Sequence, residues 1–129
     1  MSEEEASAVF KQDLKTIEGY VANYLANLGI SEDQYTQNEF DALVAVLYSR
    51  GNFDIATDSS DNIGTTFDEA LVEYYTYGNS EDVSNILISN GNLNVNAGYS
   101  GILDRRKAEL DIFLYGNYHS VLGDLENYN

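Results

Sequence analysis

Apolar residues recur at steps of three and four along most of the chain, which is the spacing of an amphipathic α-helix. The first run ends at Gly29, and its apolar positions form one stripe: Phe10, Leu14, Ile17, Val21, Tyr24 and Leu28. Because residues three and four apart share a helix face, the pattern predicts a long N-terminal helix within residues 1–29. We expect this stripe to face the core. The alternative is a homodimer seam along the same helix.

Two capping boxes mark helix starts farther along the chain. Thr36 is followed three residues later by Glu39, and Thr66 by Glu69. In this motif each of the two side chains accepts a backbone N–H that the first helical turn leaves unpaired. Gly-Asn pairs mark helix ends, because glycine adopts the left-handed conformation without strain. These pairs lie at 51–52, 78–79, 91–92 and 116–117.

These signals predict an all-α fold of about six helices, the last of them over residues 118–125. Residues 53–57 and 93–96 alternate apolar and polar side chains, so we expect short extended segments there. A length of 129 residues suits one domain. We therefore expect a single helical domain over residues 1–129, in which residues 30–129 form stacked antiparallel helix pairs.

Two pairs of segments indicate a degenerate repeat. Residues 43–55 match residues 83–95 at Leu, Ser, Gly and Asn, and residues 70–79 match residues 108–117 at Ala, Tyr, Gly and Asn. A helix pair cannot bury both of its faces alone, so repeated pairs stack on their neighbours. The alternative is that Gly-Asn is a common helix terminator, used four times without duplication.

The central unit resembles an ankyrin repeat. It reads FDEALVEYYTYGN, SEDVSNILISNGN and LNV in succession: a helix ended by glycine, a second helix with an acidic start, and a loop opened by Gly-Asn. The resemblance covers mainly residues 70–101 and lacks the Thr-Pro-Leu-His sequence typical of that family. It implies a protein-binding scaffold and supplies no catalytic residues.

Composition excludes several classes of protein. The chain has no cysteine, so disulfides and thiolate chemistry are absent. It has no apolar run of about 18 residues, so we expect no membrane span. Its N-terminus, MSEEEASAVF, is acidic where a secretion signal requires positive charge. We expect a cytoplasmic protein, in the host cytoplasm if it is viral, and no cofactor.

The formal net charge is −16, from 22 acidic and 6 basic residues. Such a chain repels phosphates and anionic lipid surfaces, which argues against direct binding of nucleic acid or membranes. It is drawn instead to basic protein surfaces, including those of nucleic-acid-binding proteins. Between residues 30 and 82, twelve acidic residues stand against Arg50 alone.

Tyrosines interleave with these acids, and tyrosine is common where an interface needs apolar area with a polar tip. Any single one is, by default, a half-buried core aromatic. The candidate partner-binding residues are the acids and tyrosines of this central region: Glu32, Asp33, Glu39, Asp41, Asp58, Asp61, Asp68, Glu69, Glu73, Tyr74, Tyr75, Tyr77, Glu81 and Asp82.

Candidates for a metal site or for catalysis are few. Residues 58–69 resemble a calcium loop, but Ile63 stands where the turn requires glycine, so we expect a polar loop and no metal. His119 is the only histidine and has no cysteine to join it at a zinc site. A glycosidase carboxylate pair needs a cleft, which we do not expect in so small a chain. We predict no enzyme and no catalytic residues.

The sequence therefore favours a small acidic protein-binding module that masks or inhibits a basic partner. Its extreme form is a nucleic-acid mimic of phage or mobile-element type. One alternative is a structural or assembly component, such as a virion connector or chaperone, held by apolar helix faces. A calcium-binding protein is the weakest of the three hypotheses.

Overall fold

A computed structural model describes residues 3–118 of the chain, and side-chain environments from residue 13 onward. This part holds five α-helices, one short 3-10 helix and no strand, so the predicted all-α class is confirmed. The sixth predicted helix, residues 118–125, lies almost wholly outside the described residues. The elements are α1 (Glu3–Asn27), α2 (Gln37–Arg50), η1 (Ser59–Asp61), α3 (Phe67–Tyr77), α4 (Glu81–Asn96) and α5 (Ile102–Tyr115).

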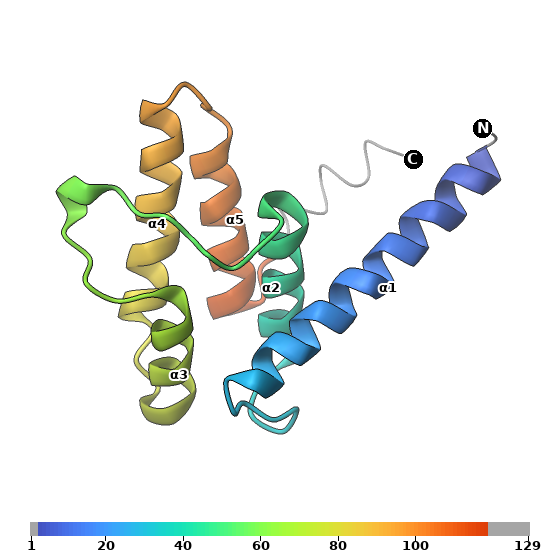
Figure 1. The fold of residues 1–129 in the computed structure, drawn as a ribbon, viewed down its shortest axis with the longest axis horizontal. Helices are drawn as coiled ribbons and strands as arrows, with labels where there is room; N and C mark the ends of the chain where they lie inside the picture. The colour runs from blue at the N-terminus through green and yellow to red at the C-terminus, as the bar shows by residue number, and fades with distance from the viewer. Residues whose placement is uncertain (1–2, 119–129) are drawn as a thin grey trace.

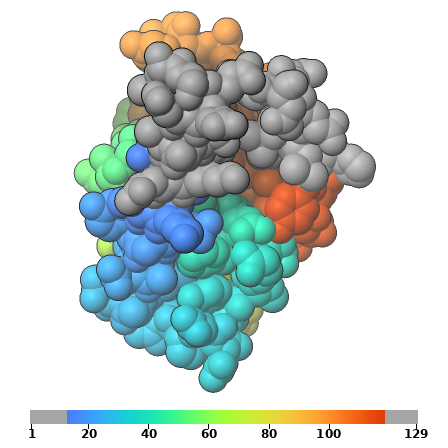
Figure 2. Space-filling model, turned by 90° about the vertical axis from the view of Figure 1, so that its right-hand side faces the viewer, coloured from blue at the N-terminus to red at the C-terminus, as the bar shows by residue number. Residues whose placement is uncertain are grey.

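The helices form an open row, in which each helix packs against one or two neighbours. Helices α4 and α5 are antiparallel neighbours, α2 packs on α5, and α1 crosses α2 (Figure 1). Helix α3 packs on α4, and the long connection over residues 51–66 runs across α5 and α4 before it turns back to α3 (Figure 1). From the side, α2 reaches the surface between α1 and α5 (Figure 2). No helix in residues 3–118 is apolar over enough length to cross a bilayer.

The apolar stripe of α1 faces the core from Ile17 onward, as predicted. Val21 and Leu25 are fully buried, and Ile17, Tyr24 and Leu28 pack against the buried cluster. Full burial of one such aliphatic side chain stabilises the fold by about 1.5–3 kcal/mol. Because this burial joins α1 to α2, the C-terminal half of α1 belongs to the body of the domain.

The capping signals are also confirmed. Thr36 and Thr66 both form complete capping boxes, with Glu39 and Glu69 as the reciprocal partners. The helices that they start end at Gly51 and Gly78, both in the left-handed conformation. Local side-chain chemistry therefore sets both ends of α2 and α3.

Two expectations about the end of α4 are wrong. Gly91-Asn92 does not stop this helix, and residues 93–96 form its last turns rather than an extended segment. The reason is the contact with α5: a side chain at Gly91 would meet the Cα of Leu103 at 2.8 Å. Gly91 is therefore a site of close helix approach, where the absence of a side chain matters more than helix propensity.

A buried carboxylate joins α2 to α3. Glu39 is 6% exposed and accepts hydrogen bonds from the hydroxyls of Tyr74, at 2.6 Å, and Tyr75, at 3.1 Å. Its Oε1 also accepts the backbone N–H of Thr36 at 2.9 Å. The tyrosine rings meet edge to face with centroids 4.9 Å apart, and Tyr74 also packs on Phe113. We call Glu39, Tyr74 and Tyr75 the Glu39 cluster.

Replacing Gly91 by alanine tests the close approach of α4 and α5. The added Cβ would lie 2.7 Å from Leu103 Cδ1 and 2.8 Å from its Cα, so the helices must separate. We expect the free energy of unfolding, measured in urea, to fall by about 1–3 kcal/mol. Gly19→Ala is the matched control: nothing lies within 4 Å of its added Cβ. That change should instead stabilise α1, by about 0.5–1 kcal/mol. Equal effects of the two substitutions would contradict the role given to Gly91.

The Glu39 cluster predicts a loss of stability at alkaline pH. Burial, followed by the hydrogen bond to Glu39, raises the pKa of Tyr74 from 10.0 to about 12. The unfolded chain therefore releases this proton first, and the free energy of unfolding should fall as pH rises from 10 through 12. Urea unfolding at a series of pH values measures the slope.

Tyr74→Phe should reduce that slope, because it removes the phenol. Tyr77→Phe should leave the slope unchanged, since Tyr77 is 82% exposed. A slope that responds equally to both substitutions would contradict the assignment to the Glu39 cluster.

Candidate functional site

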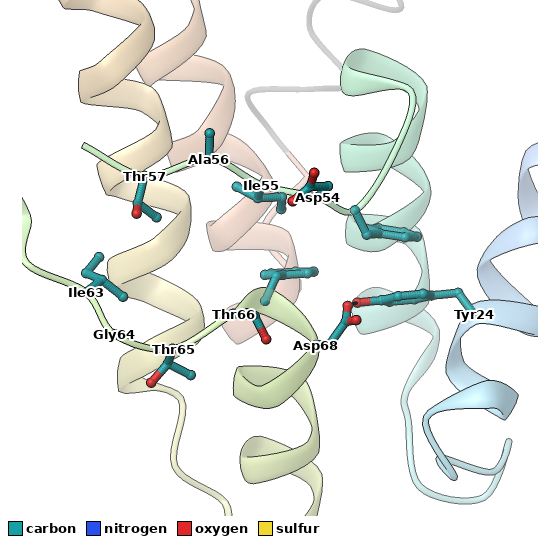
Figure 3. A pocket seen from close by; sticks show the side chains of 12 residues that line it. Tyr24, Asp54, Ile55, Ala56, Thr57, Ile63, Gly64, Thr65, Thr66 and Asp68 are labelled. Atoms are coloured by element: carbon teal, nitrogen blue, oxygen red, sulfur yellow. Dashed lines mark hydrogen bonds between the residues drawn. The ribbon is translucent and has the colours of Figure 1, made fainter. Parts of the chain in front are cut away.

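An open hollow of about 680 Å³ lies between two extended segments and beside Tyr24 of α1. Residues 53–57 form one wall, and residues 63–66 with the start of α3 form the other (Figure 3). The two segments run in opposite directions on either side of the hollow (Figure 3). The expectation that so small a chain offers no cleft is therefore wrong, because the 51–66 connection runs out along the helices and back, and its two arms enclose the hollow.

Three aromatic rings line one end of the hollow. Tyr24 stacks on Phe53 with ring centroids 4.1 Å apart and planes 20° apart. Phe53 in turn lies parallel to Phe67, with centroids 6.0 Å apart. Ile55 and Ile63 extend this apolar lining along the two walls. Phe67 and Ile55 are buried. Tyr24, Phe53 and Ile63 are partly exposed, so these three side chains offer the apolar surface to a ligand.

Two carboxylates border the hollow from opposite walls. Asp68 lies in the first turn of α3 and accepts a hydrogen bond from the hydroxyl of Tyr24. Burial, and then this hydrogen bond, raise the pKa of Tyr24, so the phenol remains a donor and orients the Asp68 carboxylate. The positive end of α3 also favours a negative charge at this position.

Asp54, the second carboxylate, is exposed on the other wall. Both backbone polar groups of Asp54 are hydrogen-bonded. Arg50 donates to the Asp54 carbonyl at 2.5 Å, and Asn52 Oδ1 accepts the Asp54 N–H at 3.0 Å. The wall is therefore anchored here, while the Asp54 carboxylate has no hydrogen-bond partner among the described residues.

The connection between the walls is a hydrogen-bonded turn. Asp58 accepts hydrogen bonds from the N–H and hydroxyl of Ser60 and from the side-chain amide of Asn96. These bonds lower the pKa of Asp58, and the bond from the Ser60 N–H has the largest effect. Glu69 is likewise engaged, as the capping partner of Thr66. No group of three or more His, Cys, Asp or Glu residues within 3–118 is placed to hold a metal ion. His119 lies outside the described residues.

The predicted partner-binding residues are distributed over several elements, and only Asp68 lines the hollow. Glu39 is buried and Tyr74 and Tyr75 are half-buried around it, which leaves them little surface. Asp41 accepts a hydrogen bond from Tyr118. Partner binding by the others stays a prediction. They lie in the connection before α2, on η1 and its flank, along α3 and at the start of α4: Glu32, Asp33, Asp58, Asp61, Glu69, Glu73, Tyr77, Glu81 and Asp82.

Of the twelve residues that line the hollow, sequence reasoning named only Asp68 as a site residue, and those that it missed include Tyr24, Phe53, Asp54 and Phe67. Tyr24 was assigned to the core stripe of α1, and Phe53 and Asp54 to an alternating extended segment. Both assignments are right as local structure: Ile55 is buried and Asp54 exposed, as alternation predicts. No local signal shows that Phe67, fourteen positions beyond Phe53, joins the same aromatic row.

Comparison with known proteins gives one positive result. The family model described as phage lysozyme matches residues 1–109, a range that includes every residue lining the hollow. No match is found among curated proteins or among solved structures.

This match overturns three expectations from the sequence: the ankyrin-type repeat, the acidic inhibitor or nucleic-acid mimic with its alternatives, and the absence of enzymatic activity. The physical source of the error is that helix stops and acidic residues are common to many all-α proteins, so neither pattern is specific to one family. The match spans 109 of 129 residues, and the chain belongs to the phage lysozyme family.

Proposed function

We propose that the protein hydrolyses glycosidic bonds in the glycan strands of peptidoglycan, and that the hollow between residues 53–57 and 63–68 binds the strand. The observation that carries this proposal is the phage lysozyme match over residues 1–109. The hollow lies wholly within that range and is the place where aromatic rings and two carboxylates meet. Its two extended walls suit a linear polymer.

The lining offers the contacts that an amino sugar requires. Tyr24 and Phe53, both partly exposed, provide apolar surface for a sugar ring, and Phe67, at 2% exposed, supports Phe53 from within the core. Thr57 and Thr65 line the same hollow and carry hydroxyls that can pair with sugar hydroxyls and acetamido groups.

Glycoside hydrolysis requires two carboxyl groups with different roles, and the hollow contains Asp54 and Asp68. In such enzymes one carboxylic acid protonates the leaving oxygen, and the other carboxylate acts as nucleophile or activates water. Asp54 and Asp68 are the two carboxyl groups that line the hollow, and we assign the two roles to this pair. Tyr24 orients the Asp68 carboxylate by donating a hydrogen bond to it.

Substituting the two carboxylates tests the proposal. Asp54→Asn and Asp68→Asn should each lower the rate of muropeptide release from purified peptidoglycan by at least about 100-fold, because each removes a group that transfers a proton or stabilises charge. The products are measured by chromatography and mass spectrometry, with new reducing ends counted as a second readout.

Asp61→Asn is the matched control for both substitutions. Asp61 is exposed on η1, lies outside the hollow and loses the same charge. It should retain the wild-type rate. Wild-type protein that releases no fragments would refute the proposed function, and full activity of Asp54→Asn and Asp68→Asn would refute the assigned roles.

The net charge of −16 predicts how salt affects the reaction. The peptide stems of peptidoglycan carry carboxylates, so enzyme and substrate repel each other. Raising the salt concentration from about 0.01 M to about 0.15 M shortens the screening length from about 30 Å to about 8 Å. We therefore expect hydrolysis of peptidoglycan to become faster over this range. Hydrolysis of a neutral oligomer of N-acetylglucosamine should be unaffected, and a rate on peptidoglycan that falls with salt would contradict this expectation.

A further inference from the structure

A buried polar cluster lies behind the 53–57 wall. It consists of Ser49 on α2, Asn90 on α4, and Arg106 and Glu109 on α5. The guanidinium of Arg106 pairs with the Glu109 carboxylate, donates to Asn90 Oδ1 at 2.9 Å and to Ser49 Oγ at 3.2 Å. Ser49 Oγ also lies 3.2 Å from Glu109 Oε2. We call these four residues the Arg106 cluster.

The Arg106 cluster continues into the wall through Asn90. The Oδ1 of Asn90 is taken by Arg106, so its Nδ2 is turned outward and donates to the carbonyl of Ala56 at 2.8 Å. The neighbouring residue of α4, Ser89, accepts the backbone N–H of Asp58 at 2.8 Å. Two adjacent buried residues of one helix thus hold Ala56 in the wall and Asp58 directly after it.

These bonds are the connection between the helices and a segment with no regular structure of its own. Residues 54–58 have neither helical nor strand pairing, so the backbone polar groups of the wall need partners elsewhere. Arg50 and Asn52 hold Asp54, and Asn90 and Ser89 hold Ala56 and Asp58. Asp54 therefore stands on a stretch that is anchored at every second residue.

The cluster is built to hold Asn90 in one orientation. Asn90 is fully buried, Arg106 is 2% exposed and Glu109 1% exposed, and no buried side-chain polar atom in the described part of the chain lacks a partner. A flipped Asn90 amide would place an N–H against the guanidinium and an oxygen against the Ala56 carbonyl. Both contacts would be repulsive inside the protein, where unpaired polar groups are costly.

We propose that Asn90 and Ser89 are positioning residues for the proposed hydrolysis: set by the Arg106 cluster, they fix the wall that carries Asp54 against the hollow. The kinetic part of this inference depends on the proposed function, whereas the structural part does not. Neither residue lines the hollow, so each acts through the wall and not through the glycan.

The experiment uses Ser89→Ala with Ser84→Ala as its matched control. Ser84 is on the same helix, but its hydroxyl donates to the carbonyl of Ser80, the residue that precedes α4. Hydrogen exchange of the Asp58 amide is measured by NMR relative to the amide of Val46, a buried residue of α2, so that a change in global stability cancels. Ser89→Ala should raise this ratio at least about tenfold, and Ser84→Ala should leave it unchanged.

A second variant tests Asn90 without removing its contact to Arg106. Asn90→Asp keeps an oxygen for the guanidinium but removes the donor to Ala56, so the carbonyl carbon resonance of Ala56 should move. Asn85→Asp, an exposed change on the same helix, adds the same charge and should not move it. This variant keeps the proposal testable even if the loss of the Ser89 hydroxyl is compensated by water.

Kinetics distinguish positioning from a general loss of stability. With rates normalised to folded protein, Ser89→Ala and Asn90→Asp should lower kcat about tenfold or more while KM changes little, because Asp54 is displaced and binding surfaces remain. Unchanged exchange, unchanged Ala56 resonance and unchanged kcat in both variants would overturn the inference. Should the wild-type protein hydrolyse no glycan, the proposed function fails, and the NMR measurements alone decide whether the wall is positioned as inferred.

Discussion

The burial of one guanidinium group constrains most of this structure. Removing a charge from water costs several kcal/mol. Ion pairing and hydrogen bonds offset this cost only where each polar atom of the buried group has a partner. Arg106 meets this condition with groups from α2, α4 and α5, so these three helices must keep their separations for the charge to be tolerated. Burial raises the pKa of Glu109 although Arg106 acts in the opposite direction, which shows how dry the site is. Removing one partner of such a pair leaves an uncompensated buried charge, so the pair requires α2, α4 and α5 to keep this arrangement.

The hollow depends on that arrangement because its walls do not support themselves. Residues 53–57 and 63–66 have no ladder between them, so their separation is set by where each is attached. The first wall is attached to α4 through Asn90 and Ser89, and the second continues into α3 through the capping box of Thr66. Tyr24 closes the end by joining α1 to Asp68. The hollow is thus a consequence of helix packing, although most of its lining comes from a connection.

The parts of this architecture that sequence could predict are those governed by near neighbours. The stripe of α1 and the two capping boxes depend on residues three or four apart, and all were found where expected. The pairing of Arg106 with Glu109 follows helical spacing, since the two residues are three apart, but its burial depends on Ser49 and Asn90 from other helices.

Failures of prediction share the same origin in distant contacts. Gly91-Asn92 has the form of a helix stop, yet the approach of Leu103 makes glycine necessary inside a continuous helix. The hollow combines residues 24, 53 and 68, which no spacing rule connects. Acidic composition was the most misleading guide, because a count of carboxylates says nothing about the environment of any one of them.

Two carboxylates of this chain show the difference that environment makes. Glu39 and Asp68 each accept a hydrogen bond from tyrosine, and both lie in the first turn of a helix. Glu39 receives two tyrosines and a backbone N–H, is covered by them, and serves as a link between α2 and α3. Asp68 receives one tyrosine and remains exposed beside a row of aromatic rings, with acceptor positions left for a ligand. The same pairing of residue types therefore builds a core contact in one place and a candidate catalytic group in the other, and solvent access to the carboxylate decides which.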